Sequence, residues 1–115
     1  MSARRTPRQS AELARLRAEI DELDRRIVDL LNRRAELTVA VGHEKSALGR
    51  RAIRDRDRER EVLLRVSIAN EGHVPQTDLL GIYRRLIASA RALEAAERER
   101  LARGQDDGPA EPPGA

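Results

Sequence analysis

The sequence contains no cysteine, no tryptophan and no phenylalanine, and Tyr83 is its single aromatic residue. The absence of cysteine excludes disulfide bonds and thiolate chemistry, and it gives no indication of an oxidising compartment. The near absence of aromatic residues removes the large side chains that usually anchor the core of a small monomer. Aliphatic residues therefore supply nearly all of the 39% hydrophobic content, which favours a helical protein completed by oligomerisation.

Long apolar runs are also missing, since no stretch approaches the roughly 20 apolar residues of a membrane span. The N-terminal segment MSARRTPRQS is basic but lacks the apolar core of a secretory signal. A chain of 115 residues is long enough for one domain. We therefore expect a single cytoplasmic domain without membrane contact.

The charges of the chain are numerous but interspersed. Basic residues outnumber acidic ones by 23 to 20, and no aromatic residues lie among them for base stacking. Nucleic acid is therefore not an expected partner. A non-catalytic helical dimer that acts as an interaction or nucleic-acid-binding module stays open as an alternative of another class. One detail stands out: Lys45 is the single lysine among 22 arginines.

Turn residues and lapses of periodicity divide the chain into three predicted helices, near residues 10–47, 55–71 and 76–102. The two breaks between them are SALGRRAI and EGHVPQ. We expect disordered tails before and after the helices, a basic one over 1–9 and an acidic one rich in proline and glycine over 104–115. The predicted fold is all-α, with one domain over residues 10–103.

The first predicted helix carries apolar residues at alternating steps of three and four, the spacing of a coiled coil: Leu13, Leu16, Ile20, Leu23, Ile27, Leu30, Leu37 and Val41. At 1.5 Å per residue this helix is about 57 Å long. One small chain cannot cover such a stripe. The sequence therefore predicts an intertwined antiparallel homodimer in which two copies of the long first helix lie together.

Three cationic residues lie along this helix, and the distances between them determine which of them can bind the same ligand. Arg34 interrupts the apolar stripe, and Lys45 follows three turns later on the same face, with Cα atoms roughly 16 Å apart. Both could hold one small dianion, although such side chains also commonly extend to water. Arg17 lies about 42 Å from Lys45, too far to reach it within one chain. In an antiparallel pair centred near residue 28, Arg17 of one copy would lie opposite roughly residue 39 of the other, between the two other cations.

A charge-rich segment, RRAIRDRDREREVL, follows the first break. If a helix begins near Asp55 with that carboxylate as N-cap, one set of residues shares a face that can fold back over Lys45: Asp55, Arg58, Glu59 and Val62. The alternate positions would face water: Asp57, Arg60 and Glu61. The segment is therefore predicted to be partly surface and partly site.

Three segments at suitable spacings resemble one known family: LRAEIDELDRRIVDLLNRRAELTVAVGHEK, IRDRDRERE and IYRRLIASARALE. Over roughly residues 12–95 the chain resembles the all-helical, type II (AroQ-class) chorismate mutases. The resemblance implies an isomerase of the shikimate pathway and aromatic amino acid biosynthesis, which rearranges chorismate to prephenate without a metal or cofactor. It also implies an intertwined dimer of three-helix chains with shared sites.

The resemblance further implies a role for each candidate residue. Arg17 of the partner chain and Arg34 would bind the substrate carboxylates, while Lys45 would contact a carboxylate and the ether oxygen. Residues of the second helix would serve the ring hydroxyl: Asp55 chiefly through its backbone, Glu59, and Arg58 as a supporting charge.

Two positions depart from the common family pattern. Ala90 stands where many members have serine, which removes a hydroxyl donor to a carboxylate. Glu94 stands where many members have glutamine, and a carboxyl group there donates to the ether oxygen only when protonated. Lys45 and a protonated Glu94 would together stabilise the charge that develops on that oxygen. Glu94 could equally be a surface acid of the run LEAAERER.

Other substrates remain open within the same fold. Amino-deoxychorismate mutases and isochorismate pyruvate-lyases are the nearest alternatives. Glu59 as an acceptor from a ring hydroxyl favours chorismate, but an amine could also donate to it. Whether a partner enzyme activates the protein, and whether its product feeds primary or secondary metabolism, also stays open.

Overall fold

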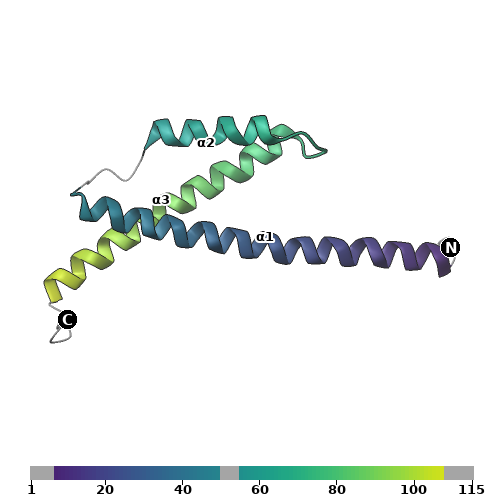
Figure 1. Cartoon of the computed structure of the whole chain (residues 1–115), viewed down its shortest axis with the longest axis horizontal. Coiled ribbons are helices and arrows are strands. Elements are labelled where there is room, and N and C mark those ends of the chain that lie inside the picture. The colour runs from purple at the N-terminus through teal and green to yellow at the C-terminus, as the bar shows by residue number, and fades with distance from the viewer. Residues whose placement is uncertain (1–6, 50–54, 108–115) are drawn as a thin grey trace. The chain divides into compact units, whose positions relative to one another are not determined.

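The computed structural model describes residues 7–49 and 55–107, and this part of the chain contains three α-helices and no strand. They are α1 (Pro7–Ala47), α2 (Arg56–Ala69) and α3 (Gln76–Asp107), labelled in Figure 1. The predicted all-α fold with three helices and a long first helix is confirmed. The chain divides into two compact units between Arg34 and Ala35. The N-terminal unit holds the first part of α1, and the C-terminal unit holds the end of α1 with α2 and α3.

The outer limits of α1 and α3 extend beyond the predicted ones. Proline is tolerated in the first turn because its missing N–H has no helical partner there, and α1 begins at Pro7. Glycine within a helix costs only about 1 kcal/mol, and α3 continues through Gly104 to Asp107. Residues 7–9 and 104–107 of the tails expected to be disordered are thus helical. The remaining tail residues lie outside the described part.

The end of α1 and the start of α2 follow from local chemistry. Gly49 comes just after α1 with φ of 75°, a left-handed conformation that glycine adopts without strain. Asp55 is the N-cap of α2, and its side chain accepts a hydrogen bond from the Arg58 backbone N–H at 2.9 Å. The predicted cap is confirmed, and it satisfies one of the free N–H groups at the helix start.

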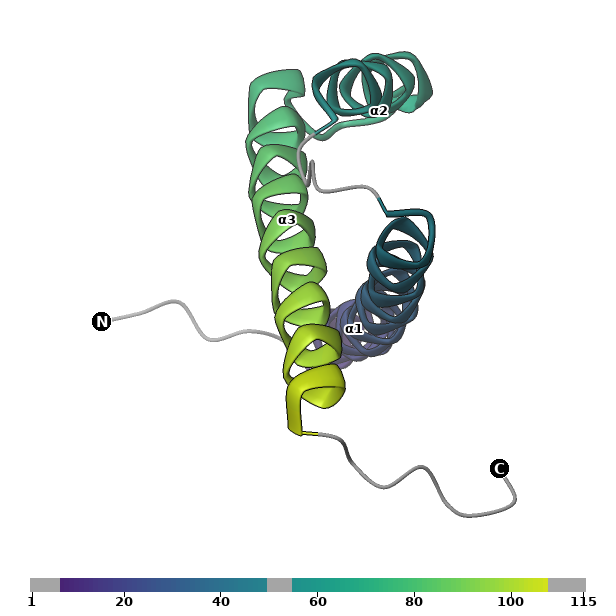
Figure 2. The same ribbon diagram turned by 90° about the vertical axis from the view of Figure 1, so that its left-hand side faces the viewer.

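Asn70 ends α2 two residues before the predicted position and ties it to α3. Its backbone is extended, with φ of −80° and ψ of 100°. The Asn70 side-chain amide donates to the Val74 carbonyl at 2.9 Å and to Gln76 Oε1 at 2.7 Å. Because Gln76 is the first residue of α3, these bonds hold the turn between the two helices closed. Figure 2 shows α2 beside the first part of α3.

The C-terminal unit is held together where α2 packs against α3 and α3 meets the end of α1. The inward face of α3 repeats at steps of three and four, as an amphipathic helix requires: Tyr83, Ile87, Ala90, Glu94 and Glu97. Ile87 is buried, with 8% of its surface exposed. Among the described residues Ile87 is the one apolar side chain that is buried, so the unit has a thin core.

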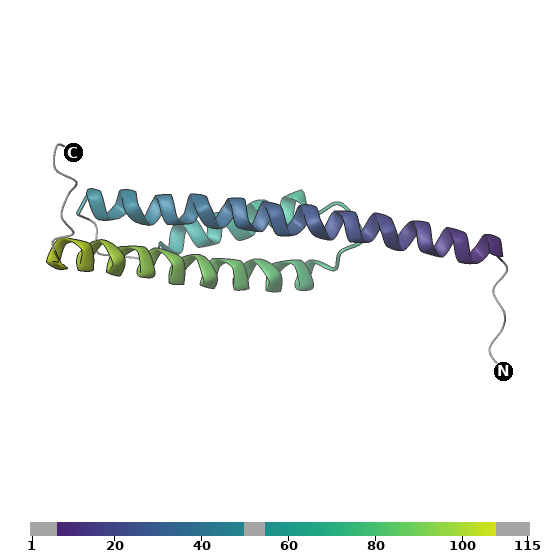
Figure 3. The ribbon, with the colours of Figure 1, turned by 90° about the horizontal axis from the view of Figure 1, so that it is seen from below.

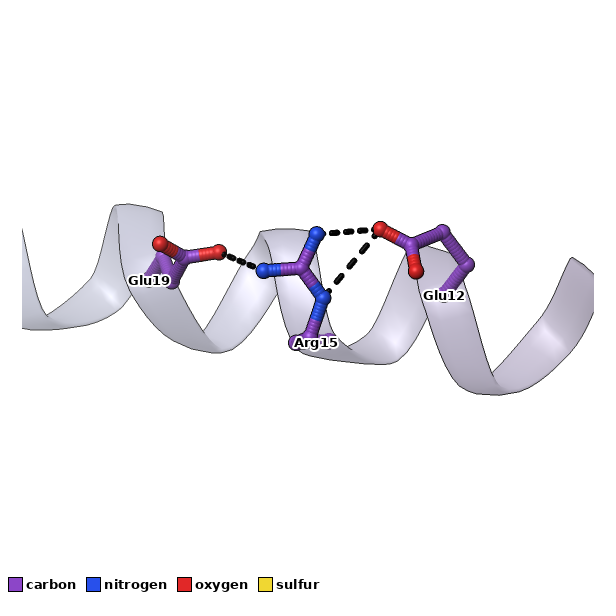
Figure 4. Close-up of polar contacts among 3 residues, drawn as sticks. All are labelled: Glu12, Arg15 and Glu19. Atoms are coloured by element: carbon purple, nitrogen blue, oxygen red, sulfur yellow. Dashed lines mark hydrogen bonds and ion pairs between the residues drawn. The ribbon is translucent and has the colours of Figure 1, made fainter.

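The N-terminal unit is an amphipathic helix with an exposed apolar stripe. Five of its large apolar side chains are between 45% and 68% exposed: Leu16, Ile20, Leu23, Ile27 and Leu30. Ion pairs line its polar side, where Arg15 bridges Glu12 and Glu19 (Figure 4). The hydrogen bond to Glu12, with the charge of Glu19, raises the pKa of Arg15. No helix in the described part of the chain is both long and apolar enough to cross a bilayer.

Candidate active site

One ion pair joins the end of α1 to α3. Lys45 Nζ donates to Glu94 Oε1 at 2.7 Å, and the two side chains are only 15% and 12% exposed. Figure 3 shows the two helix segments side by side. A charge-assisted bond away from bulk water is stronger than the same bond at the surface. Glu94 is therefore an inward-facing partner of Lys45, and the alternative interpretation of Glu94 as a surface acid is wrong.

Gly42 allows α1 and α3 to approach each other at this point. It is buried in the middle of α1, and a Cβ atom built on it would lie 3.1 Å from the Glu94 Cα atom. That distance is tighter than nine in ten real contacts of this kind. A side chain at residue 42 would therefore push the Glu94 backbone away and change how Glu94 meets Lys45. The sequence offered one signal, since glycine inside a helix often marks close packing.

A second ion pair joins α2 to α3. Arg91 Nη1 donates to Glu59 Oε2 at 3.0 Å, and the side chains are 33% and 17% exposed. Glu59 lies one turn after the N-cap Asp55, so both belong to the first part of α2. Arg91 precedes Glu94 by three residues, which places the two on one face of α3. The Glu59 and Lys45 pairs thus occupy neighbouring positions along α3.

The remaining charges of α2 lie at the surface, as predicted for Asp57, Arg60 and Glu61. Asp57 and Arg60 form an exposed i,i+3 pair. The Arg58 side chain, which the sequence placed on the inward face, is 57% exposed and donates to Glu61 at 2.5 Å. A long, flexible side chain makes such a local pair at little cost. The structure does not bring Arg58 to Lys45.

A buried carboxylate that the sequence did not single out lies one turn beyond Glu94. Glu97 accepts two hydrogen bonds from Arg100, at 2.8 and 2.9 Å, and its Oε2 atom lies 3.4 Å from His43 Nδ1. The hydrogen bonds from Arg100 lower the pKa of the Glu97 carboxyl to about 2, with burial opposing and His43 adding to the shift. The pattern LEAAERER looks like a solvated run, so only packing reveals this residue.

The other candidate residues are on separate parts of the chain. Arg17 is exposed and Arg34 is half-buried, and both belong to the N-terminal unit. Ala90 is half-buried on the face of α3 that carries Glu94, while the neighbouring Ser89 is exposed. The serine hydroxyl is thus next to this face but not on it. Of the candidate residues, the C-terminal unit brings Lys45 to Glu94, and it brings Glu59 to Arg91, which lies three residues before Glu94 on α3.

Comparison with known proteins identifies the family to which the chain belongs. The family model for chorismate mutase type II matches residues 16–95, which is most of the chain. The chain belongs to the chorismate mutase type II family. The resemblance seen over roughly residues 12–95 is therefore confirmed. Every candidate residue from Arg17 to Glu94 lies inside the matched range, whereas Glu97 and Arg100 lie outside it.

A curated chorismate mutase relative shows the same relationship. The chain is 39% identical over 87 residues to a bifunctional chorismate mutase/prephenate dehydratase of Aquifex aeolicus (strain VF5). The aligned region is 72% of this chain and 24% of the relative. The chain thus spans about a quarter of the curated relative that it matches, which carries a second activity in its name.

Proposed function

We propose that the chain is a chorismate mutase, an isomerase that rearranges chorismate to prephenate. The observation that carries this proposal is the half-buried contact between Lys45 and Glu94, inside the range that matches the family model. The reaction is a pericyclic rearrangement within one molecule, so it needs no nucleophile. It needs a flexible dianion held in a compact chair and positive charge beside the breaking C–O bond.

Lys45 has the chemistry that the ether oxygen requires. An ammonium group carries three N–H donors, so it can bind Glu94 and substrate at the same time. The contact with Glu94 orients Lys45 before substrate arrives, which is the condition for effective electrostatic stabilisation. As the C–O bond breaks, negative charge grows on the ether oxygen and the ammonium stabilises it. Arg34, eleven residues earlier in α1, would bind a substrate carboxylate.

The start of α2 would receive the ring end of the substrate. Asp55 and Glu59 would orient the ring hydroxyl or accept a hydrogen bond from it. The capped first turn of α2 holds both residues in place. Ala90 offers no hydroxyl to a carboxylate, so binding of that group would rely on the cations. Arg58 would act only as a supporting charge, which agrees with its exposed position.

We also propose that the active form is an intertwined antiparallel homodimer. The exposed stripe of the N-terminal unit supports this, because surfaces with contiguous apolar side chains usually mark an interface. Arg17 lies too far along α1 to serve the Lys45 of its own chain. In the antiparallel arrangement Arg17 of one copy would complete the site of the other.

The product would pass to an enzyme that consumes prephenate. This proposal draws on the relative from Aquifex aeolicus, whose name joins chorismate mutase to prephenate dehydratase in one chain. A separate partner enzyme could then also regulate the mutase.

The direct experiment is to incubate the purified protein with chorismate and follow its loss together with the appearance of prephenate. Amino-deoxychorismate and isochorismate serve as parallel substrates. Prephenate formation at a rate typical of enzymes, between about 1 and 10³ per second, would support the proposal. Release of pyruvate from isochorismate without prephenate formation would favour the pyruvate-lyase alternative instead.

A further inference from the structure

Arg91 is singled out by the structure alone. In the sequence it is one of 22 arginines, and the family resemblance assigns it no role. In the structure it reaches from α3 to α2 and donates to Glu59 at 3.0 Å. Most ion pairs of the described residues join neighbours on one helix and are largely exposed, as Arg58 and Glu61 are. The Arg91–Glu59 pair joins two helices, and Glu59 keeps only 17% of its side chain exposed.

The position of this pair relates it to the proposed substrate. Arg91 and Glu94 are three residues apart on α3, so their Cβ atoms are about 5–6 Å apart. Glu94 holds Lys45, the residue proposed to serve the ether oxygen. Glu59 is the residue proposed to accept from the ring hydroxyl. The guanidinium of Arg91 is therefore adjacent to the group that contacts the ring substituent.

We propose that Arg91 determines whether this site takes a hydroxyl or an amine on the substrate ring. The inference rests on the proposed function. A carboxylate attracts an ammonium more strongly than a neutral hydroxyl, and an aliphatic amine is largely protonated at neutral pH. Without the positive charge of Arg91, Glu59 would therefore bind amino-deoxychorismate more favourably. Arg91 balances the charge of Glu59 and repels a second cation beside it, so the neutral hydroxyl of chorismate is preferred.

The charge of the substrate acts in the same direction. Chorismate is a dianion, so the negative charge of Glu59 near it opposes binding. Arg91 offsets that repulsion and makes an acid acceptor compatible with an anionic substrate. The amino analogue brings its own positive charge and needs Arg91 less. Removing Arg91 should therefore weaken chorismate turnover and strengthen, or spare, that of amino-deoxychorismate. Discrimination between two substrates is set by this difference rather than by either affinity alone.

The test compares kcat/KM for the two substrates in the full chain. Arg91→Met removes the charge and keeps the length, while Arg91→Lys keeps the charge. Arg103→Met is the matched control, because Arg103 lies on α3 in an exposed pair with Glu99 at 3.9 Å. Circular dichroism verifies folding, and Arg91→Gln replaces Arg91→Met if the latter does not fold.

We expect the wild type to prefer chorismate and Arg91→Met to shift the kcat/KM ratio toward amino-deoxychorismate by about tenfold or more, which corresponds to about 1.4 kcal/mol. Arg91→Lys should restore most of the preference, and Arg103→Met should leave it unchanged. Equal losses for both substrates in a folded Arg91→Met would show a merely structural role and overturn the inference, with the proposed function intact. A wild type that turns over neither substrate would overturn the proposed function and the inference with it.

Discussion

The two units of the chain use the same kinds of residue in opposite ways. In the N-terminal unit, large apolar side chains such as Leu23 and Leu30 are 52% and 68% exposed, and the charges form local pairs along one helix. In the C-terminal unit, charged side chains from different helices face each other and are largely covered, as Lys45 and Glu94 are. Apolar surface lies outside and ionic chemistry inside, the reverse of an ordinary small domain.

The contrast indicates that the two units have different roles. Exposed apolar surface is a driving force for association that one chain leaves unused. Covered charges cost free energy unless they are paired, and those of the C-terminal unit form ion pairs between helices, as Lys45 with Glu94 and Arg91 with Glu59 do. In the proposed function, the dimer would form through the N-terminal unit, and Lys45 and Glu94 of the C-terminal unit would serve the reaction.

The largest effect should come from the apolar stripe. Leu23→Asp combined with Ile27→Asp places two charges in the proposed interface, at a cost of about 3 kcal/mol or more for each. We expect dissociation into monomers and loss of nearly all mutase activity, because neither site would receive Arg17. Sedimentation velocity and prephenate formation are the measurements. Ile68→Asp, at an apolar residue of α2 that is 70% exposed, is the control and should remain dimeric. If the double variant Leu23→Asp, Ile27→Asp were monomeric and still active, the proposal that activity depends on a dimer formed by the N-terminal unit would be wrong.

The next effect concerns the C-terminal unit. Lys45→Ala removes an oriented cation from the ether oxygen, and kcat/KM should fall on the order of 10²-fold or more, as for the loss of one oriented donor. The dimer should persist, since Lys45 lies outside the exposed stripe of the N-terminal unit. Arg65→Ala removes an exposed cation of α2 and should change kcat/KM less than twofold. Near-normal turnover by a dimeric Lys45→Ala variant would exclude Lys45 from the site.

A smaller effect is expected at Glu94. A glutamine donates a hydrogen bond at any ordinary pH, whereas an ionised carboxylate repels the charge that grows on the ether oxygen. Glu94→Gln should therefore raise kcat/KM several-fold. Steady-state rates of the wild type and Glu94→Gln with chorismate test this. Equal kcat/KM values for the two proteins would show that Glu94 does not contact the ether oxygen.

The smallest effect concerns stability rather than activity. The pKa of Glu97 is lowered from 4.5 to about 2, chiefly by the hydrogen bonds from Arg100. A depressed carboxyl pKa stabilises the folded state above the unfolded value, and this contribution disappears as pH falls through the folded one. Glu97→Gln should thus be less stable than wild type above about pH 4.5, with the difference shrinking toward pH 2. Urea unfolding across this range measures it, with the exposed Glu99→Gln as control. A constant difference would contradict the assigned pKa.

Local features of the sequence were sufficient to predict the helices. The three-and-four spacing from Leu13 to Val41 predicted α1, and an aspartate before a charge-rich run predicted the cap at Asp55. The errors occurred at helix ends, where Asn70 stops α2 early and Gly104 fails to stop α3. The free energy of a helix cap and the cost of one glycine in a helix are similar in size to the helix propensities of the neighbouring residues. Local sequence patterns therefore predict the positions of helix ends poorly.

The candidate site was only partly predictable. Lys45 was recognisable because its type is unique in the chain, and Glu94 because its spacing matched a known pattern. Arg91 and Glu97 were not recognisable, because their significance depends on which residue of another helix they meet. Gly42 offered only the general signal of a glycine inside a helix. Arg91 meets Glu59 across 32 positions of sequence, and a pattern within one helix contains no information about such a pairing.

The most direct test of the account is complementation between two inactive variants. Arg17→Ala and Lys45→Ala are purified separately, mixed in equal amounts under conditions that allow subunit exchange, and assayed with chorismate. Random exchange makes half of the dimers mixed, and each mixed dimer has one intact site that takes Lys45 from one chain and Arg17 from the other. Activity should therefore rise to about a quarter of the wild-type value. If exchange is verified by mass spectrometry and activity stays at the sum of the two parents, the site is not shared between copies and the account is contradicted.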